Sequence, residues 1–480
     1  MAPARDLRAV NFVSYAFAVL LVVVCVARVT FGRRKVEPAF VWLLLVASLT
    51  FYSWHIPVYL SVLLLSSGVD YLAALALERP GRSTRQRRWI LAVSLSTNLG
   101  LLAFFKYFGF FLDNVQWGSK AVGLSFERPE WRVVLPMGIS FYTFQSMSYT
   151  IDVYRGRLKA LRSVRDFLLF ISFFPQLVAG PIVRASEFLP QMPRVRRPHW
   201  RVIGTGLALI VEGYFLKMVC ADNLAGYVDK YWATAYEPDA NSVVLIWLAL
   251  LFSGQIFCDF AGYSQVARGI AYLLGYQLPV NFHHPYIAGS FKNFWERWHI
   301  TLSRWLRDYL YVPLGGNRIS PARTYLNLML VMLLGGLWHG AAWTFIVWGT
   351  LHGSALAIER MLGLHRGLER RSWAIRVGWG VLVQVTVLVT WVFFRSDSLD
   401  GALQFLRNIV RFEGATPNWE MWTAVAFLVP VVVVHLWGWL VEHGRVNALT
   451  PARRAMLTGV LLYAILSTYG STNALIYFQF

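Results

Sequence analysis

Charged residues are scarce in this chain. Lys, Arg, Asp and Glu make up 15% of its 480 residues and hydrophobic residues 57%, whereas soluble globular proteins carry about 25% charged residues. A soluble core cannot bury that much apolar surface, so the two or three soluble domains that the length alone suggests, at roughly 100–200 residues per domain, are not expected. We expect lipid to be the solvent for much of the chain.

Cysteine and the familiar catalytic motifs are also scarce. Cys25, Cys220 and Cys258 are widely spaced within apolar runs, which indicates three buried thiols rather than a disulfide framework or a metal site. The sequence holds no G-x-S-x-G elbow, no P-loop, no H-E-x-x-H and no paired C-x-x-C. These absences argue against an ordinary serine hydrolase, a nucleotide-driven motor and a metalloenzyme, and we expect no bound metal.

Acidic residues are outnumbered by basic ones, 25 to 45, which gives a formal net charge of +20. Nucleic-acid binding is one interpretation of such an excess. However, the basic residues lie between long apolar runs, which favours a membrane protein whose Lys and Arg collect in cytoplasmic loops. We therefore expect a lipid bilayer, and no nucleic acid, as the partner.

Apolar runs recur along the chain, most of them close to the roughly 20 residues that a helix needs to cross a bilayer. The predicted spans are 11–31, 39–55, 57–77, 89–112, 133–151, 203–221, 242–262, 325–338, 341–361, 373–394, 422–441 and 455–475. Two stretches that are apolar but rich in polar groups, 164–180 and 291–312, are predicted to be re-entrant or interfacial helices. The sequence predicts an all-α polytopic membrane protein with about 11–13 transmembrane helices.

The basic segments orient the predicted spans. The most basic are GRRK (32–35), RPGRSTRQRR (79–88), RGRLKALRSVR (155–165) and RVRRPHWR (194–201). Placing them in the cytoplasm puts the N-terminus outside, together with residues 113–131 and the stretch around 222–239.

Residues 260–318 differ from the rest because charges, aromatic residues, Gly and Pro crowd together there. On a helix, Trp295, His299, Ser303 and Arg307 would fall at four-residue intervals on one face, which could line a polar tunnel and meet an anionic cofactor. The alternative is an amphipathic interfacial helix that turns its basic residues toward lipid headgroups.

His339 lies in an apolar stretch at a predicted break between two helices, in the sequence Gly-Leu-Trp-His-Gly. A buried neutral imidazole could take a proton from a hydroxyl group near physiological pH. The alternative is a structural histidine that bonds a backbone carbonyl at the helix break. His352 follows thirteen residues later and is interpreted as structural, and His283 and His284 are predicted to lie in a turn because a proline follows them.

Four long motifs of the sequence resemble the bacterial membrane-bound O-acyltransferase family, and most closely its alginate O-acetyltransferase branch. They are MGISFYTFQSMSYTIDVYRG (137–156), FFPQLVAGPIVRASEFLPQ (173–191), NFWERWHITLSRWLRDYLYVPLGGNR (293–318) and GGLWHGAAWTFIVWGTLHG (335–353). The resemblance extends from about residue 40 to the end, ALIYFQF, whereas NFHHPY departs from the asparagine-rich form typical of the branch.

The resemblance implies a ring of helices around a thinned centre crossed by a tunnel. It implies that His339 is the invariant family histidine where the donor and acceptor routes meet, and that His299 is the second motif histidine on the cytoplasmic side. Other residues match the motifs or share the predicted polar face and are candidates to contact substrate or line the tunnel: Arg297, Trp298, Ser303, Trp305, Arg307, Asp308 and Trp338.

The resemblance further implies a multi-pass acetyltransferase of the bacterial cytoplasmic membrane. Its donor would be a cytoplasmic acyl thioester such as acetyl-coenzyme A, with no permanently bound cofactor. Its acceptor would be a hydroxyl of an extracytoplasmic glycan, alginate-like or another envelope polymer, or of a periplasmic SGNH-type acetyltransferase that passes the acetyl group on. The chain is predicted to be one membrane domain, 1–480, with N-terminal helices (1–130), a catalytic core (131–365) and C-terminal helices (366–480).

Three other functions remain open from the sequence. One is transfer of D-alanyl groups to teichoic acid. Another is transport, because buried histidines relay protons in transporters, although the paired broken helices of many transporter folds are not seen here. A third is a non-catalytic export or scaffold subunit.

Overall fold

The regular structure of the chain is helical throughout the part that the computed structural model describes. That part comprises residues 12, 14–31, 38–54, 56–129, 131, 133–194, 198–237, 240–412, 414 and 419–468. Six helical segments within it are long and apolar enough to cross a membrane: Tyr59–Leu77, Thr84–Ala121, Trp200–Tyr236, Ser242–Leu274, Trp373–Arg395 and Trp419–Glu442. The prediction of an all-α polytopic membrane protein is confirmed.

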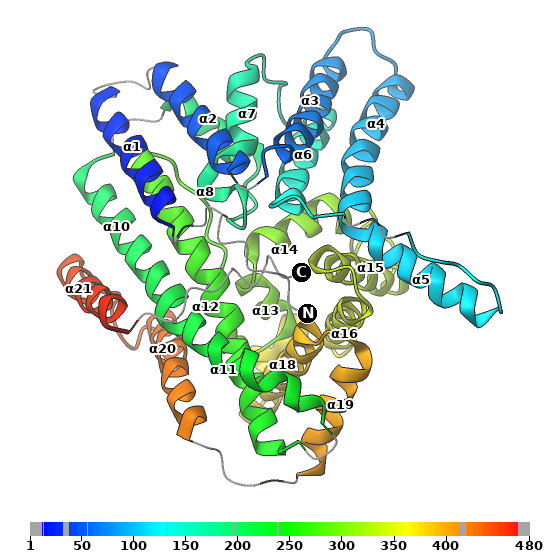
Figure 1. Cartoon of the computed structure of the whole chain (residues 1–480), viewed down its shortest axis with the longest axis vertical. Coiled ribbons are helices and arrows are strands. Elements are labelled where there is room, and N and C mark those ends of the chain that lie inside the picture. Colours follow the sequence, from blue (N-terminus) through cyan, green and yellow to red (C-terminus); the bar gives the residue numbers. More distant parts are fainter. Residues whose placement is uncertain are drawn as a thin grey trace. The chain divides into compact units, whose positions relative to one another are not determined.

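The helices group into two compact units, drawn together in Figure 1. The first unit comprises Met1–Leu207 and Val266–Pro279, and the second comprises Ala208–Gln265 and Val280–Phe480. Two of the three boundaries fall inside helices, α10 (Trp200–Tyr214) and α12 (Ser242–Leu274), and the third falls after α12, between Pro279 and Val280. Each unit is described in turn, and the predicted division at residues 130 and 365 stays a prediction.

The first unit holds the N-terminal helices. They are α1 (Tyr15–Phe31), α2 (Pro38–Ser53), α3 (Tyr59–Leu77), α4 (Thr84–Leu102), the π-helix η1 (Ala103–Tyr107), α5 (Phe108–Ala121), α6 (Ile139–Tyr154), α7 (Val164–Ser172), α8 (Phe174–Leu177), α9 (Ala185–Phe188) and the 3₁₀-helix η2 (Leu189–Arg194). Local sequence explains the start of α4, where Ser83 and Gln86 form a reciprocal capping box. Cys25 on α1 is only half-buried, so the expectation of three buried thiols is wrong for this residue.

A buried carboxylate joins three of these helices. Asp70 on α3 accepts hydrogen bonds from the hydroxyls of Ser94 on α4 and Ser146 on α6, and from Asn98 Nδ2 at 2.9 Å. Asn98 in turn accepts a hydrogen bond from Ser66 at 2.7 Å. Polar side chains that satisfy one another in this way hold apolar helices together where lipid offers no hydrogen bonds, so this cluster explains why α3, α4 and α6 pack closely.

The second unit holds most of the sequence motifs. Beyond parts of α10 and α12, its elements are the π-helix η3 (Phe215–Ala221), α11 (Asp222–Trp232), the 3₁₀-helices η4 (Ala233–Tyr236) and η5 (Pro285–Ile287), α13 (Phe291–Arg297), α14 (Ile300–Leu306), the π-helix η6 (Arg307–Tyr311), α15 (Pro321–His339), α16 (Trp343–Met361), α17 (Leu364–Gly367), the 3₁₀-helix η7 (Leu368–Arg370), α18 (Trp373–Arg395), α19 (Leu399–Arg411), α20 (Trp419–Glu442) and α21 (Pro451–Thr468). Serines start several of them: the hydroxyls of Ser290, Ser320 and Ser372 accept backbone N–H groups at the first turns of α13, α15 and α18.

α15 and α16 make the most extensive helix contact in the second unit and lie side by side (Figure 1). A β-carbon on Gly336 would overlap the carbonyl oxygen of Phe345, and one on Gly349 would overlap the carbonyl oxygen of Met332. Small residues at a crossing let two helix backbones approach closely. These two glycines therefore set the spacing between α15, which ends at His339, and α16.

Candidate active site

The predicted helix 291–312 is broken at His299. α13 ends at Arg297, Trp298 is extended, and His299 has a left-handed backbone with φ of 41° before α14 begins at Ile300. The expected alignment of four side chains on one face is therefore wrong, because four-residue spacing places side chains together only on a continuous helix. A left-handed backbone costs a residue with a side chain about 1–3 kcal/mol, so the surroundings must stabilise this break.

Asn281 stabilises the break from the preceding loop. Its backbone carbonyl accepts the Ile300 N–H at 2.9 Å. Its side-chain Oδ1 accepts the Thr301 N–H at 3.2 Å and the Thr301 hydroxyl at 2.8 Å. The same oxygen lies 3.2 Å from His299 Nδ1, while Asn281 Nδ2 donates to Ser264 Oγ on α12 at 3.3 Å.

These contacts determine the tautomer of His299. A backbone N–H can only donate, so the Asn281 atom that Thr301 contacts must be the amide oxygen, and His299 Nδ1 must carry the proton that points at it. Nε2 is therefore the unprotonated nitrogen and acts as an acceptor. His299 is fully buried and lies outside the long spanning helices, and its burial lowers its pKa to about 3. The ring is neutral at physiological pH.

His339 is the last residue of α15 and lies in a pocket of aromatic rings. Its ring centroid is 5.1 Å from that of Trp338, 5.1 Å from that of Trp348 on α16 and 5.4 Å from that of Phe394 on α18. The residue is 5% exposed. Gly340 follows in an extended conformation, so the predicted helix break at this histidine is confirmed.

The structure brings His339 and His299 together. Their ring centroids are 6.3 Å apart, and the Trp338 ring lies 5.9 Å from His299. The ring of Phe260 on α12 is perpendicular to that of His299, with the centroids 4.7 Å apart. Two imidazoles that are far apart in sequence thus share one aromatic, water-poor environment, in which hydrogen bonds are electrostatically stronger than in water.

The other predicted aromatic residues support this arrangement at different distances. Trp298 is buried and packs on Phe282, at 5.0 Å, and on Trp391, at 4.8 Å. Trp305 is also buried, and its ring is tilted against that of Tyr309 with the centroids 5.2 Å apart.

The predicted charged residues form ion pairs of their own. Arg297 makes a two-pronged pair with Glu442 at the end of α20, at 2.8 and 2.7 Å. Arg307 pairs with the adjacent Asp308 at 2.7 Å, and its side chain is 60% exposed. Ser303 donates to the Trp298 carbonyl at 3.4 Å, where it supports the helix break.

His352 connects three helices. Its ring stacks on Phe294 of α13 at 6.0 Å and lies 4.7 Å from Trp348. Thr390 on α18 donates its hydroxyl proton to the Val387 carbonyl, so its oxygen accepts from His352 Nε2 at 3.0 Å. These contacts agree with the structural interpretation of His352.

His284 lies in a turn, as predicted, and has a left-handed backbone immediately before Pro285.

Several residues near the two histidines were not predicted. They include Asn281 and Ser264, which orient His299, and Trp348 and Phe394, which surround His339. Glu359 of α16, which lies at the start of α13, was not predicted either: it is fully buried, accepts the first backbone N–H groups of α13 from Phe291 and Lys292 at 2.6 and 3.0 Å, and accepts the Trp379 indole N–H at 3.0 Å. A carboxylate within an apolar stretch is a signal that could have pointed to Glu359, whereas nothing local distinguishes Asn281.

Comparison with known proteins adds to this geometry. Residues 58–369, which include both histidines, match the sequence profile of the membrane-bound O-acyltransferase family. The chain belongs to this family. It is 40% identical to a probable alginate O-acetylase of Azotobacter vinelandii over 375 residues, which cover 77% of this chain and 72% of that protein.

Other relatives of this O-acyltransferase carry different names. A peptidoglycan O-acetyltransferase of Helicobacter pylori is 38% identical over 404 residues, covering 78% of this chain and 74% of the relative. A teichoic acid D-alanyltransferase of Bacillus subtilis is 27% identical over 280 residues, covering 55% and 69%. This O-acyltransferase is therefore an enzyme and a multi-pass membrane protein, and the predicted family is confirmed.

Proposed function

We propose that this O-acyltransferase moves an acetyl group from a cytoplasmic thioester, acetyl-coenzyme A, across the membrane of a bacterial cell. The acceptor is a hydroxyl on an extracytoplasmic envelope polysaccharide or on a periplasmic relay partner of SGNH type. The observation that carries the proposal is the pair of buried imidazoles, His339 and His299, 6.3 Å apart within the family-matched region. The names of the alginate and peptidoglycan relatives favour acetyl over other acyl groups.

His339 acts as the general base in this proposal. The acceptor O–H bond breaks as its proton moves to the His339 imidazole, and the acceptor oxygen bonds to the thioester carbonyl carbon. The carbon–sulfur bond of the tetrahedral intermediate then breaks, and the leaving thiolate takes the proton from the imidazolium. No covalent acyl-enzyme is needed, and the aromatic rings around His339 keep water away from the thioester.

His299 acts as a hydrogen-bond acceptor through Nε2. Because Nδ1 donates to Asn281, the neutral ring has no proton on Nε2 to offer an oxyanion. We assign it the task of orienting the acceptor hydroxyl, or an amide N–H of the thioester donor, by accepting its hydrogen bond.

The N–H group that we propose for the oxyanion belongs to Trp348. This indole is 1% exposed and lies beside His339, and its Nε1 has no hydrogen-bond acceptor among the described residues.

The variant Trp348→Phe keeps an aromatic ring and removes the N–H. We expect its kcat to fall about tenfold to a hundredfold, toward the loss seen when an oxyanion donor is removed. The matched control is Trp295→Phe, whose indole N–H also has no acceptor in the described structure but which contacts His352 rather than His339. Equal losses in the two variants would contradict the assignment to Trp348.

Asn281→Ala tests the orientation of His299. The change removes the acceptor of the Thr301 N–H and frees His299 to adopt either tautomer, so we expect acyl transfer to fall about tenfold, as is typical of residues that orient catalytic groups. Ser264→Ala is the milder comparison, because it removes only the partner of Asn281 Nδ2. If Asn281→Ala transferred acetyl groups at the wild-type rate, Asn281 would have no role in positioning.

The decisive experiment for the function uses inside-out membrane vesicles that contain the purified chain. They are given acetyl-coenzyme A that is labelled on its acetyl group. The acceptor glycan, which consists of alginate or peptidoglycan fragments, is enclosed in the lumen. We expect label bound covalently to the glycan. Label that enters the lumen without a covalent product would favour a transporter, and transfer only from a D-alanyl carrier protein would favour the D-alanyl alternative.

A further inference from the structure

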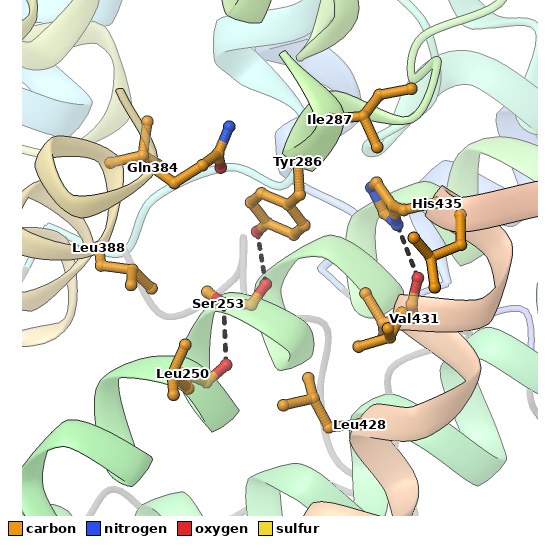
Figure 2. Close-up of a pocket in the computed structure, with 12 residues that line it drawn as sticks. Leu250, Ser253, Tyr286, Ile287, Gln384, Leu388, Leu428, Val431 and His435 are labelled. Atoms are coloured by element: carbon orange, nitrogen blue, oxygen red, sulfur yellow. Dashed lines mark hydrogen bonds between the residues drawn. The ribbon is translucent and has the colours of Figure 1, made fainter. Parts of the chain in front are cut away.

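Two neighbouring cavities along α20 lie outside the proposed active site. The first is an apolar groove of about 290 Å³ between α12, α18 and α20 (Figure 2), and eight of its twelve lining residues are aliphatic. The second is a polar cleft of about 700 Å³ between α13, the α16–α18 connection and the C-terminal end of α20. Ile287 lines both, so the two cavities adjoin.

The groove opens to the surface of α20. Val432 and Leu436 line it and yet are 50% and 55% exposed. Figure 2 shows Tyr286 and His435 next to each other at the groove, and their rings stack at 5.1 Å. Two polar atoms at these positions bond within the protein: the Tyr286 hydroxyl donates to the Ser253 carbonyl at 2.6 Å, and His435 Nδ1 donates to the Val431 carbonyl at 2.7 Å. The surface left in the groove suits a hydrocarbon chain.

The cleft carries balanced charge. Three basic residues line it, Lys292, Arg297 and Arg366, together with three acidic ones, Glu296, Glu369 and Glu442. Lys292 lies 3.5 Å from Glu296, and Arg297 pairs with Glu442. Arg366 and Glu369 have no ion-pair partner in the part of the chain that the structure describes. A polyanion such as coenzyme A would need an excess of cations, whereas a zwitterion matches one free cation beside one free carboxylate.

The combined length of the cavities matches one bilayer leaflet. Lining residues on α20 run from Leu428 to Glu442, and fourteen residue steps of helix rise about 21 Å. Half of a bilayer that is about 40–45 Å thick, headgroups included, is about 20–22 Å. Trp439 lies at the polar end, where aromatic side chains favour the headgroup level.

The distribution of arginines indicates which leaflet of the bilayer the groove and the cleft face. Residues 362–372 and 443–454, at the cleft end of α18 and α20, carry six arginines, whereas the connection 396–418 at the opposite end carries two. The positive-inside rule therefore places the cleft on the cytoplasmic side.

We propose that the cleft and groove together bind one zwitterionic phospholipid of the cytoplasmic leaflet. Its phosphate pairs with Arg366, its ammonium group pairs with Glu369, and one acyl chain occupies the groove between α18 and α20. The site binds lipid and is independent of acetyl transfer, so its test needs no catalytic readout.

The groove is tested by lipid retention. The chain is reconstituted in vesicles of equal phosphatidylethanolamine and phosphatidylglycerol, extracted with detergent and analysed by native mass spectrometry. Val432→Trp fills the groove, and we expect it to retain about tenfold less phosphatidylethanolamine than wild type. Val433→Trp is the matched control, on the same helix and 56% exposed but not lining the groove, and it should retain lipid normally. Equal loss in both variants would show only unspecific surrounding lipid and would overturn the proposal.

The cleft is tested by headgroup preference. Arg366→Ala should also retain about tenfold less phosphatidylethanolamine, as expected for loss of a charge-assisted hydrogen bond, whereas Arg371→Ala, in the same connection but outside the cleft, should not. Glu369→Gln should abolish the preference for phosphatidylethanolamine over phosphatidylglycerol. Displacement of the lipid by coenzyme A, or an unchanged preference in Glu369→Gln, would overturn the zwitterionic assignment.

Discussion

His339→Ala is expected to lower kcat for acetyl transfer by about 10²–10⁴, the range that a general base contributes. The imidazole lies at the end of α15 among the rings of Trp338, Trp348 and Phe394, and the centroid of the His299 ring is 6.3 Å from its own. The donor thioester does not depend on this base for binding, so KM for acetyl-coenzyme A should change by less than about threefold. Steady-state transfer in the vesicle assay measures both constants.

Two comparisons make the His339 result specific. His339→Gln keeps a hydrogen-bonding side chain but cannot take up a proton, and it should be as inactive as the alanine variant. His199→Ala removes an exposed histidine from the first unit and should leave transfer unchanged. Wild-type kcat in His339→Ala would remove the proposed base, whereas a matched loss in His199→Ala would indicate a general defect in the preparation.

Gly349→Ala is expected to destabilise the second unit and to displace His339. The added methyl group would overlap the Met332 carbonyl on α15, and inserting a methyl into a closely packed contact costs about 1–3 kcal/mol. The relief of that overlap moves α15, whose last residue is His339, and a shift of about 1 Å at a catalytic group lowers rates about 10²-fold. We expect a lower thermal midpoint in detergent together with a large loss of kcat.

Gly378→Ala provides the matched control for that prediction. Gly378 lies within α18, and a β-carbon there meets no atom within 4 Å. The same substitution should leave activity intact and raise stability by up to about 1 kcal/mol, because glycine is a poor helix former. Indistinguishable midpoints for Gly349→Ala and Gly378→Ala would show that the close α15–α16 contact does not exist in solution.

The local sequence pattern was sufficient to predict most helices of this chain. The predicted runs 57–77, 242–262 and 373–394 correspond to α3, α12 and α18 within a few residues at most ends, although α12 continues to Leu274. Length, apolar content and serine caps are properties of contiguous residues, and helices in lipid must satisfy their own backbone hydrogen bonds. The break at His339 was equally readable, since a glycine follows it.

The helix break at His299 could not be predicted from the sequence, because the residues that cause it lie elsewhere in the chain. The residues 291–312 have the composition of one amphipathic helix, yet Asn281, which donates to Ser264, hydrogen-bonds the His299 ring and the Thr301 N–H. The pairing of Arg297 is a similar case: its partner Glu442 lies 145 residues away. Neither partner has a spacing or motif that connects it to the histidine segment.

The sequence by itself determined that this chain is a helical membrane protein, and its motifs identified the family and the two histidines. Those conclusions depend on composition and on contiguous residues. Only the tertiary structure decided that His299 and His339 meet, that Asn281 sets the proton on His299, and that α20 carries a groove and a charged cleft. The reason is that each of these features joins helices distant in sequence, so its geometry depends on packing that no local pattern encodes.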